Sequence, residues 1–131
     1  MRGLSHLSRE DLGYQLHTNR EFGMMLRGIK PLAVFSDGYG RFPDVVLRYM
    51  RLFDCHVDAG RFLKREYVET GDAHPIHVVL YALPEEEWRI DRMIELRKEI
   101  SQWTPKFERL EGRLLGYTEE QNDLWMARRP D

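Results

Sequence analysis

The chain has 131 residues, of which 42% are hydrophobic and 32% charged, and its net charge is -2. This length suits one domain over residues 1–131 whose core needs neither metal nor disulfides, and we expect no cofactor. A mean hydropathy of -0.58 with 11% aromatic residues excludes a disordered chain and a membrane-spanning one. The near-neutral charge disfavours nucleic acid and membrane surfaces as partners.

The sequence contains one cysteine, Cys55, which has no second thiol in the chain with which to form a disulfide. An isolated thiol is typical of a reducing compartment. Residues 1–6 contain no apolar stretch like that of a signal peptide, and arginine outnumbers lysine as it does in proteins from GC-rich genomes. We therefore expect a cytoplasmic protein of the bacterial type.

Capping signals predict helical structure before residue 28. Ser8 is placed to cap a first helix, and residues 18–21 form a capping box for a second start. Gly28 predicts the end of this segment. Because each half contains a glycine, residues 9–27 form either one kinked helix or two. Four apolar residues recur at helical spacing and are expected to face inward: Phe22, Met25, Leu26 and Ile29.

The middle of the chain predicts a mixture of strands and one helix. The apolar run at residues 32–35 predicts a buried strand that leads into a loop at residues 36–41. A helix is expected over residues 43–54, with an apolar face that comprises Val45, Val46, Tyr49, Met50 and Phe53. Residues 61–69 and 76–83 predict an antiparallel hairpin, whose first strand carries charge on both faces and therefore lies at an edge.

Helical periodicity returns from Pro84 to the end of the chain. Thr104 with Pro105 predicts the start of one helix, and Gly116 predicts its end. A capping box at residues 118–121 predicts a last short helix. The expected fold is α+β, with a small antiparallel sheet covered on one face by N-terminal and C-terminal helices. Leu80 and Leu110 are expected in its core.

Histidines and carboxylates near the hairpin are the candidates for acid–base chemistry, because they transfer protons near neutral pH. If the loop at 36–41 meets the hairpin at residues 74–77, a pocket forms between them. The catalytic candidates are Asp37, His56, His74 and His77. No spacing typical of metal ligands is present, so no metal site is expected, and solvated or core histidines remain the simpler interpretation.

The loop itself is a candidate for anion binding, because it follows a strand and precedes a helix. It lacks the third glycine of a dinucleotide fingerprint, and a tight connection that uses glycine for positive φ explains it equally well. The ligand-binding candidates are Ser36, Asp37, Gly38, Tyr39, Gly40 and Arg41.

Aromatic residues that do not fit the apolar stripe of the C-terminal helices suggest an interface, since tryptophan is enriched at interface hot spots. Trp88, Leu124 and Trp125 are the candidates. The leading hypothesis is a non-catalytic domain that binds a protein partner or associates with itself. The alternative is a small enzyme or ligand-binding domain that uses the pocket described above. A third hypothesis, which the net charge disfavours, is nucleic-acid binding through Arg61, Lys64 and Arg65.

Overall fold

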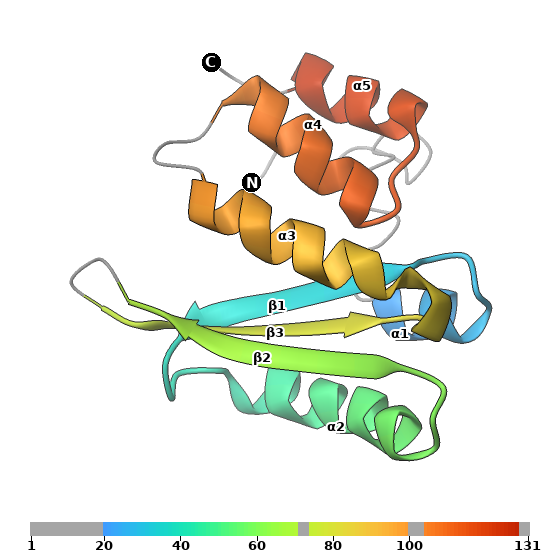
Figure 1. The fold of residues 1–131 in the computed structure, drawn as a ribbon, viewed down its shortest axis with the longest axis vertical. Coiled ribbons are helices and arrows are strands. Elements are labelled where there is room, and N and C mark those ends of the chain that lie inside the picture. The colour runs from blue at the N-terminus through green and yellow to red at the C-terminus, as the bar shows by residue number, and fades with distance from the viewer. Residues whose placement is uncertain (1–19, 71–73, 100–103, 129–131) are drawn as a thin grey trace.

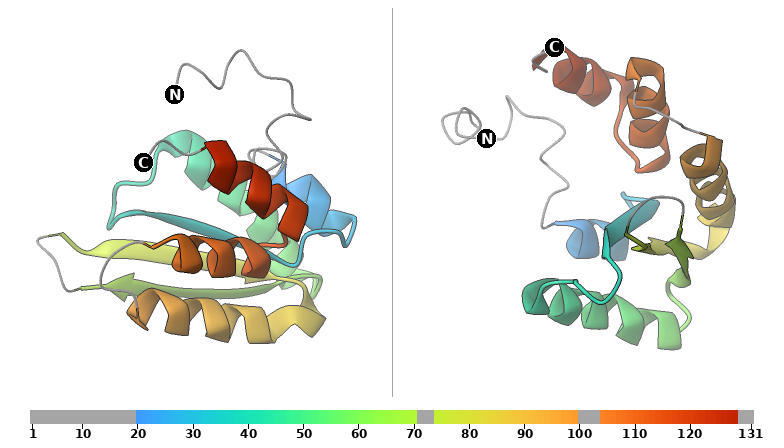
Figure 2. Two further views of the ribbon diagram at one scale, coloured as in Figure 1. Left: turned by 90° about the horizontal axis from the view of Figure 1, so that it is seen from above. Right: turned by 90° about the vertical axis from the view of Figure 1, so that its left-hand side faces the viewer.

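The computed structural model describes residues 20–70, 74–99 and 104–128, apart from a few side chains in the last helix. Three strands form one sheet in this part of the chain, with α2 on one side of it and α3, α4 and α5 on the other (Figures 1 and 2). This arrangement confirms the predicted α+β class. In chain order the elements are α1 (Glu21–Leu26), β1 (Leu32–Gly38), α2 (Asp44–Asp58), β2 (Leu63–Glu69), β3 (Ile76–Ala82), the 3-10 helix η3 (Pro84–Glu86), α3 (Glu87–Glu99), α4 (Pro105–Leu114) and α5 (Glu119–Arg128).

The strand order is β1-β3-β2, and both neighbours pair with β3 in the antiparallel direction. The predicted hairpin and the edge position of its first strand are therefore confirmed. The expectation that helices cover one face is wrong, because α2 covers the second face. The cause lies in β3, whose alternate residues Val78 and Leu80 point to α3 while Val79 and Tyr81 point to α2. A strand that is apolar on both faces needs cover on both.

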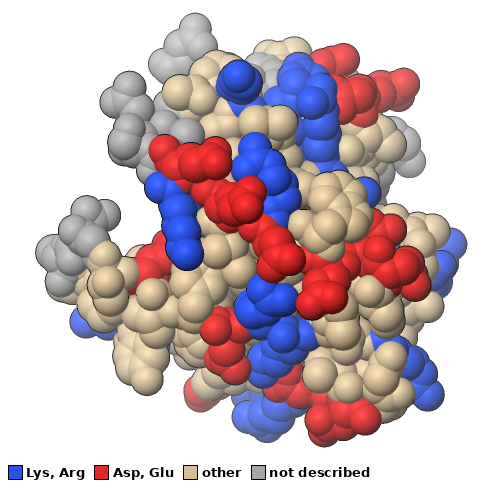
Figure 3. Space-filling model, in the orientation of Figure 1, with Lys and Arg blue, Asp and Glu red and all other residues tan. Residues whose placement is uncertain are grey.

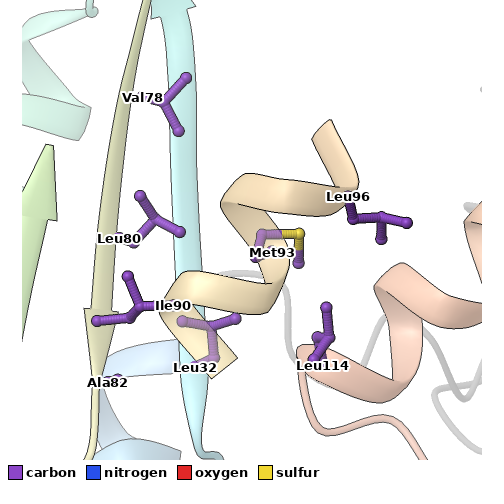
Figure 4. Packing of buried hydrophobic residues seen from close by; sticks show 8 residues of the cluster. All are labelled: Leu32, Val78, Leu80, Ala82, Ile90, Met93, Leu96 and Leu114. Atoms are coloured by element: carbon purple, nitrogen blue, oxygen red, sulfur yellow. The ribbon is translucent and has the colours of Figure 1, made fainter. Parts of the chain in front are cut away.

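Figure 4 shows the cluster between the sheet and α3, in which strand side chains meet those of the helix. Leu80 is fully buried at its centre. Leu110, expected in the core, is half-buried and packs at the margin. The buried members of this cluster are Leu32, Val78, Leu80, Ala82, Ile90, Met93, Leu96 and Leu114.

The cluster on the α2 side is rich in aromatic rings. Phe53 of α2 is fully buried, and its ring stacks on Tyr81 with centroids 4.7 Å apart. Phe35 of β1 meets Phe53 edge-on at 5.4 Å. Both geometries are favourable for aromatic pairs and help to fix the position of α2 on the sheet.

Several predicted boundaries and faces differ from the structure. Residues Ser36 to Gly38, expected in a loop, extend β1 because β3 offers pairing partners as far as Ile76. The helix predicted over 43–54 continues to Asp58, since no helix-breaking residue precedes Gly60. Three residues expected on buried helical faces are exposed: Leu26, Ile29 and Val45.

The helix caps largely follow the sequence signals. The Thr104 hydroxyl accepts a hydrogen bond from the Phe107 N–H. The predicted capping box at Thr118 and Gln121 is present in both directions, at 2.8 and 3.0 Å. Gly28 and Gly116 adopt φ values of 75° and 96° just beyond helix ends, where residues with a Cβ are strained. The predicted helix start near Ser8 lies outside the described residues, as do the first two residues of the capping box at 18–21. The helix α1 begins at Glu21, the last residue of that box.

Lys30 lies buried between β1 and the end of α4, with 2% of its surface exposed. Its Nζ donates to the Leu115 carbonyl at 2.6 Å, so it caps the C-terminal end of α4, where cations are favourable. Burial nevertheless disfavours the charged form and lowers the pKa of Lys30 to about 7. The amine therefore titrates near neutral pH in the folded protein.

We expect the free energy of unfolding to rise between pH 7 and pH 9 by about 2 kcal/mol more in the native protein than in Lys30→Met. The ordinary pKa of lysine is 10.5, so in this interval the unfolded chain holds a proton that the folded protein has released. Loss of that proton therefore favours folding as the pH rises. Urea unfolding of both proteins at the two pH values measures the difference, and parallel curves would contradict a lowered pKa.

Candidate functional site

A groove of about 380 Å³ lies between α2 and the sheet face on which α2 packs. It opens beside β2, where α2 does not cover that face. Its floor is formed by alternate residues of β2 and β3, which the register places on one face. Its lining is apolar with a few charged groups, as is usual for small-molecule sites. The residues that line it are Gly40, Phe42, Leu47, Met50, Arg51, Asp54, Lys64, Glu66, His77, Val79 and Tyr81.

A chain of polar contacts crosses the floor of the groove. His77 Nε2 lies 2.8 Å from Glu66 Oε1. Lys64 Nζ lies 3.7 Å from Glu66 Oε2 and 2.9 Å from Asp54 Oδ1. The Tyr81 hydroxyl donates to the same Asp54 oxygen at 2.8 Å. Asp54 of α2 and Glu66 of β2, the two carboxylates that line the groove, therefore already have partners within the protein.

Burial raises the pKa of Tyr81, and its hydrogen bond to Asp54 raises it further. The hydroxyl consequently stays protonated and acts as a hydrogen-bond donor. Lys64 Nζ also lies 5.6 Å from the centre of the Tyr81 ring, within the range of a cation–π contact. These contacts hold Lys64 over the sheet, although its strand lies at an edge.

The four acid–base candidates do not all meet. Asp37 and His77 are paired residues of β1 and β3, so their side chains share one face of the sheet. The His77 ring also contacts Phe42 at 5.3 Å between centroids and lines the groove. His74 is exposed just before β3.

His56 lies instead near the C-terminal end of α2, within an aromatic cluster. Its ring lies 5.2 Å from that of Phe22 and 5.4 Å from that of Phe62. Its Nδ1 lies 3.1 Å from an Arg61 guanidinium nitrogen. The helix therefore directs His56 to different neighbours from those of His77.

In the loop proposed for anion binding, backbone N–H groups already form hydrogen bonds within the protein. The Gly38 N–H donates to the Asp37 carboxylate, the Tyr39 N–H to the Pro75 carbonyl, and the Arg41 N–H to the Gly38 carbonyl. Gly40 adopts a φ of 74°, as expected for a tight turn. These three donors are occupied within the protein, and Ser36 lies in β1. Of the predicted loop, Gly40 lines the groove.

The basic candidates for nucleic-acid contact are each paired. Lys64 contacts Asp54, Arg65 contacts Asp91 at 2.8 Å, and Arg61 contacts His56. On the face shown in Figure 3, basic and acidic side chains are interleaved. This face offers no extended basic stripe of the kind that follows a phosphate backbone.

Trp88, an interface candidate, is 55% exposed on α3, and the Arg89 guanidinium lies 4.6 Å from its ring centre. Leu124 and Trp125 belong to α5, but their side chains lie outside the described part of the chain.

A second hollow, of about 510 Å³, lies on the side of α2 that turns away from the groove. Val45 and Leu52, two turns apart, are 63% and 48% exposed there. We call this surface the outer apolar face of α2; its residues are Val45, Val46, Arg48, Tyr49 and Leu52. The sequence places Val45 on a buried face, so the helical period alone did not reveal this surface.

Within the described residues, no group of three or more His, Cys, Asp or Glu side chains is arranged to hold a metal ion. None of the helices described has both the length and the apolar character that a membrane-spanning helix needs. The chain matches no protein-family model, no curated protein and no solved structure.

The sequence interpretation missed most of the groove, including Arg51, Asp54, Glu66 and Tyr81, and it named Lys64 only as a candidate for nucleic-acid contact. One signal was present, because Lys64 and Glu66 are two residues apart on a strand and so share a face. Recognising that this face meets α2 required the sheet order, in which β3 lies between β1 and β2.

Proposed function

We propose that this chain is a non-catalytic protein-interaction domain and that the outer apolar face of α2 binds its partner. The exposure of Val45 and Leu52 around a hollow supports this proposal. Solitary apolar residues on a surface are ordinary, but a contiguous exposed set on one helix face is typical of an interaction site. Tyr49 adds an amphipathic ring at the same place.

The chemistry of this face favours a partner segment with apolar side chains beside an aspartate or glutamate. Arg48 lies between Val45 and Leu52 and, within the described residues, has no ion-pair or hydrogen-bond partner. A second copy fits less well. If two copies packed their α2 helices antiparallel through this face, Arg48 of one copy would lie close to Arg48 of the other. The face contains no carboxylate to offset that repulsion.

The interaction is proposed for a reducing compartment such as the cytoplasm. Cys55 is a free and exposed thiol on α2. In an oxidising compartment an exposed thiol invites intermolecular disulfides, which would compete with a reversible interaction.

Peptide selection on the immobilised full chain tests the proposal. We expect a random display library to yield peptides that combine apolar side chains with Asp or Glu. Leu52→Ser and Arg48→Glu should each lower the affinity for the purified peptides by about tenfold or more, as the loss of an interface anchor does. Leu26→Ser is the matched control, because Leu26 on α1 is 45% exposed against 48% for Leu52.

Two results would contradict this function. The first is that selected peptides bind Leu52→Ser and the native protein equally. The second is sedimentation in which the native chain forms a dimer that Leu52→Ser dissociates, because the face would then serve self-association. Circular dichroism of each variant checks that the fold is retained.

A further inference from the structure

The groove beside β2 is separate from the outer apolar face of α2. The helix presents Leu47, Met50, Arg51 and Asp54 to the groove, and it presents Val45 and Leu52 elsewhere. Variants on one surface therefore leave the other intact. A second binding activity can be tested without disturbing the first.

The two carboxylates that line the groove are balanced by contacts within the protein. Asp54 and Glu66 share Lys64, and His77 also contacts Glu66. An incoming cation would have to compete with Lys64 for these carboxylates. The floor therefore provides polarity and shape without a free negative charge that would attract a cation.

Arg51 differs from the other charged groups of the groove. It is exposed at the helix wall and, within the described residues, has no ion-pair or hydrogen-bond partner. A guanidinium offers two parallel N–H donors, which match the two oxygens of a carboxylate. An anionic group at this wall gains a charged partner and breaks no contact within the protein.

The rest of the groove suits an apolar body. Leu47, 39% exposed, lies one helical turn from Arg51, and Phe42 and Val79 line the same hollow. A volume of about 380 Å³ accommodates a molecule the size of an aromatic acid. The apolar wall and the unpaired guanidinium stand side by side on α2, so one small molecule can contact both.

We propose that this groove binds a small organic carboxylate, with its apolar body against Leu47, Phe42 and Val79 and its carboxylate on Arg51. The activity is binding, and no covalent step is involved. Inorganic phosphate carries the charge without the apolar body, whereas an amide of the same acid carries the body without the charge. These two compounds therefore separate the two halves of the recognition.

Calorimetric titration of the full chain with 3-phenylpropionate tests this site, with 3-phenylpropionamide and inorganic phosphate as comparisons. We expect the acid to bind at least fivefold more tightly than the amide or phosphate. Arg51→Gln should remove this preference for the acid over the amide. Arg48→Gln is the matched control, one helical turn away on the outer apolar face, and should change the affinity for the acid by less than twofold.

A second variant tests the geometry independently of the loss of Arg51. Leu47→Glu places a carboxylate one turn from Arg51, where it can pair with the guanidinium. The same substitution removes apolar surface from the wall of the groove. We expect it to bind the acid at least fivefold more weakly.

The proposed site is contradicted if the amide or phosphate binds as tightly as the acid. It is equally contradicted if Arg51→Gln and Arg48→Gln change the affinity for the acid by the same factor. It is also overturned if the native protein binds none of the three compounds. Since Leu52→Ser leaves the groove residues unchanged, failure here is distinguishable from failure of the proposed protein interaction.

Discussion

Leu80→Ala is expected to lower the free energy of unfolding by roughly 4 kcal/mol, in the upper part of the range for buried leucines. Leu80 is fully buried on the central strand, and Figure 4 shows it among apolar side chains from β1 and α3. Strands on both sides and a helix above leave little freedom to collapse into the cavity. Urea unfolding followed by circular dichroism measures the loss.

Two further variants calibrate this result. Leu110→Ala, at the half-buried margin of the same cluster, is expected to cost about half as much. Val68→Ala, 40% exposed on edge strand β2, should stay within about 0.5 kcal/mol of the native protein. A loss below about 1 kcal/mol for Leu80→Ala would show that the register of β3 is wrong.

Gly112→Ala is expected to destabilise the protein by about 3 kcal/mol, although alanine normally favours helices over glycine. A Cβ at position 112 would lie 2.1 Å from Asn122 Oδ1. Asn122 is 5% exposed, so its side chain cannot move aside into solvent. The new methyl group must therefore push α4 and α5 apart.

The double variant Gly112→Ala with Asn122→Ala should recover most of the lost stability, because it removes the obstructing amide. That amide is also costly in itself, since its Nδ2 is buried with no hydrogen-bond partner in the described part of the chain. Gly23→Ala is the control: nothing lies within 4 Å of its added Cβ, so stability should hold or rise. Equal effects of the two glycine variants would refute the close approach of α5 at Gly112.

Local signals predicted the start and end of several helices correctly. Thr104, Thr118 and Gln121 make the expected caps, and Gly116 ends α4 as expected. These features depend on residues that are neighbours in sequence, so a short stretch of chain contains the necessary information. The same holds for β3, which was predicted as a strand of the hairpin with Leu80 in the core, and Leu80 is fully buried.

The candidate site was less predictable. His77 was identified, but its partner Glu66 was not, and Lys64 was named only for nucleic-acid contact. His56 and His77 were grouped because only one strand separates them in the sequence. In the fold His56 instead packs in an aromatic cluster with Phe22. Spacing along a chain does not specify which side of a sheet a helix will cover.

By itself, the sequence determined the α+β class, the hairpin of β2 and β3, and most helix caps, since these follow from local periodicity and turn chemistry. Tertiary structure decided the rest. Insertion of β3 between β1 and β2 extended β1 into the predicted loop and placed α2 on the second face of the sheet. With α2 packed on this face, some of its 15 residues lie in the core, others line the groove, and others lie on the exposed side. That division separates Phe53, Arg51 and Leu52, three residues close together in the sequence, because a helix turns about 100° per residue.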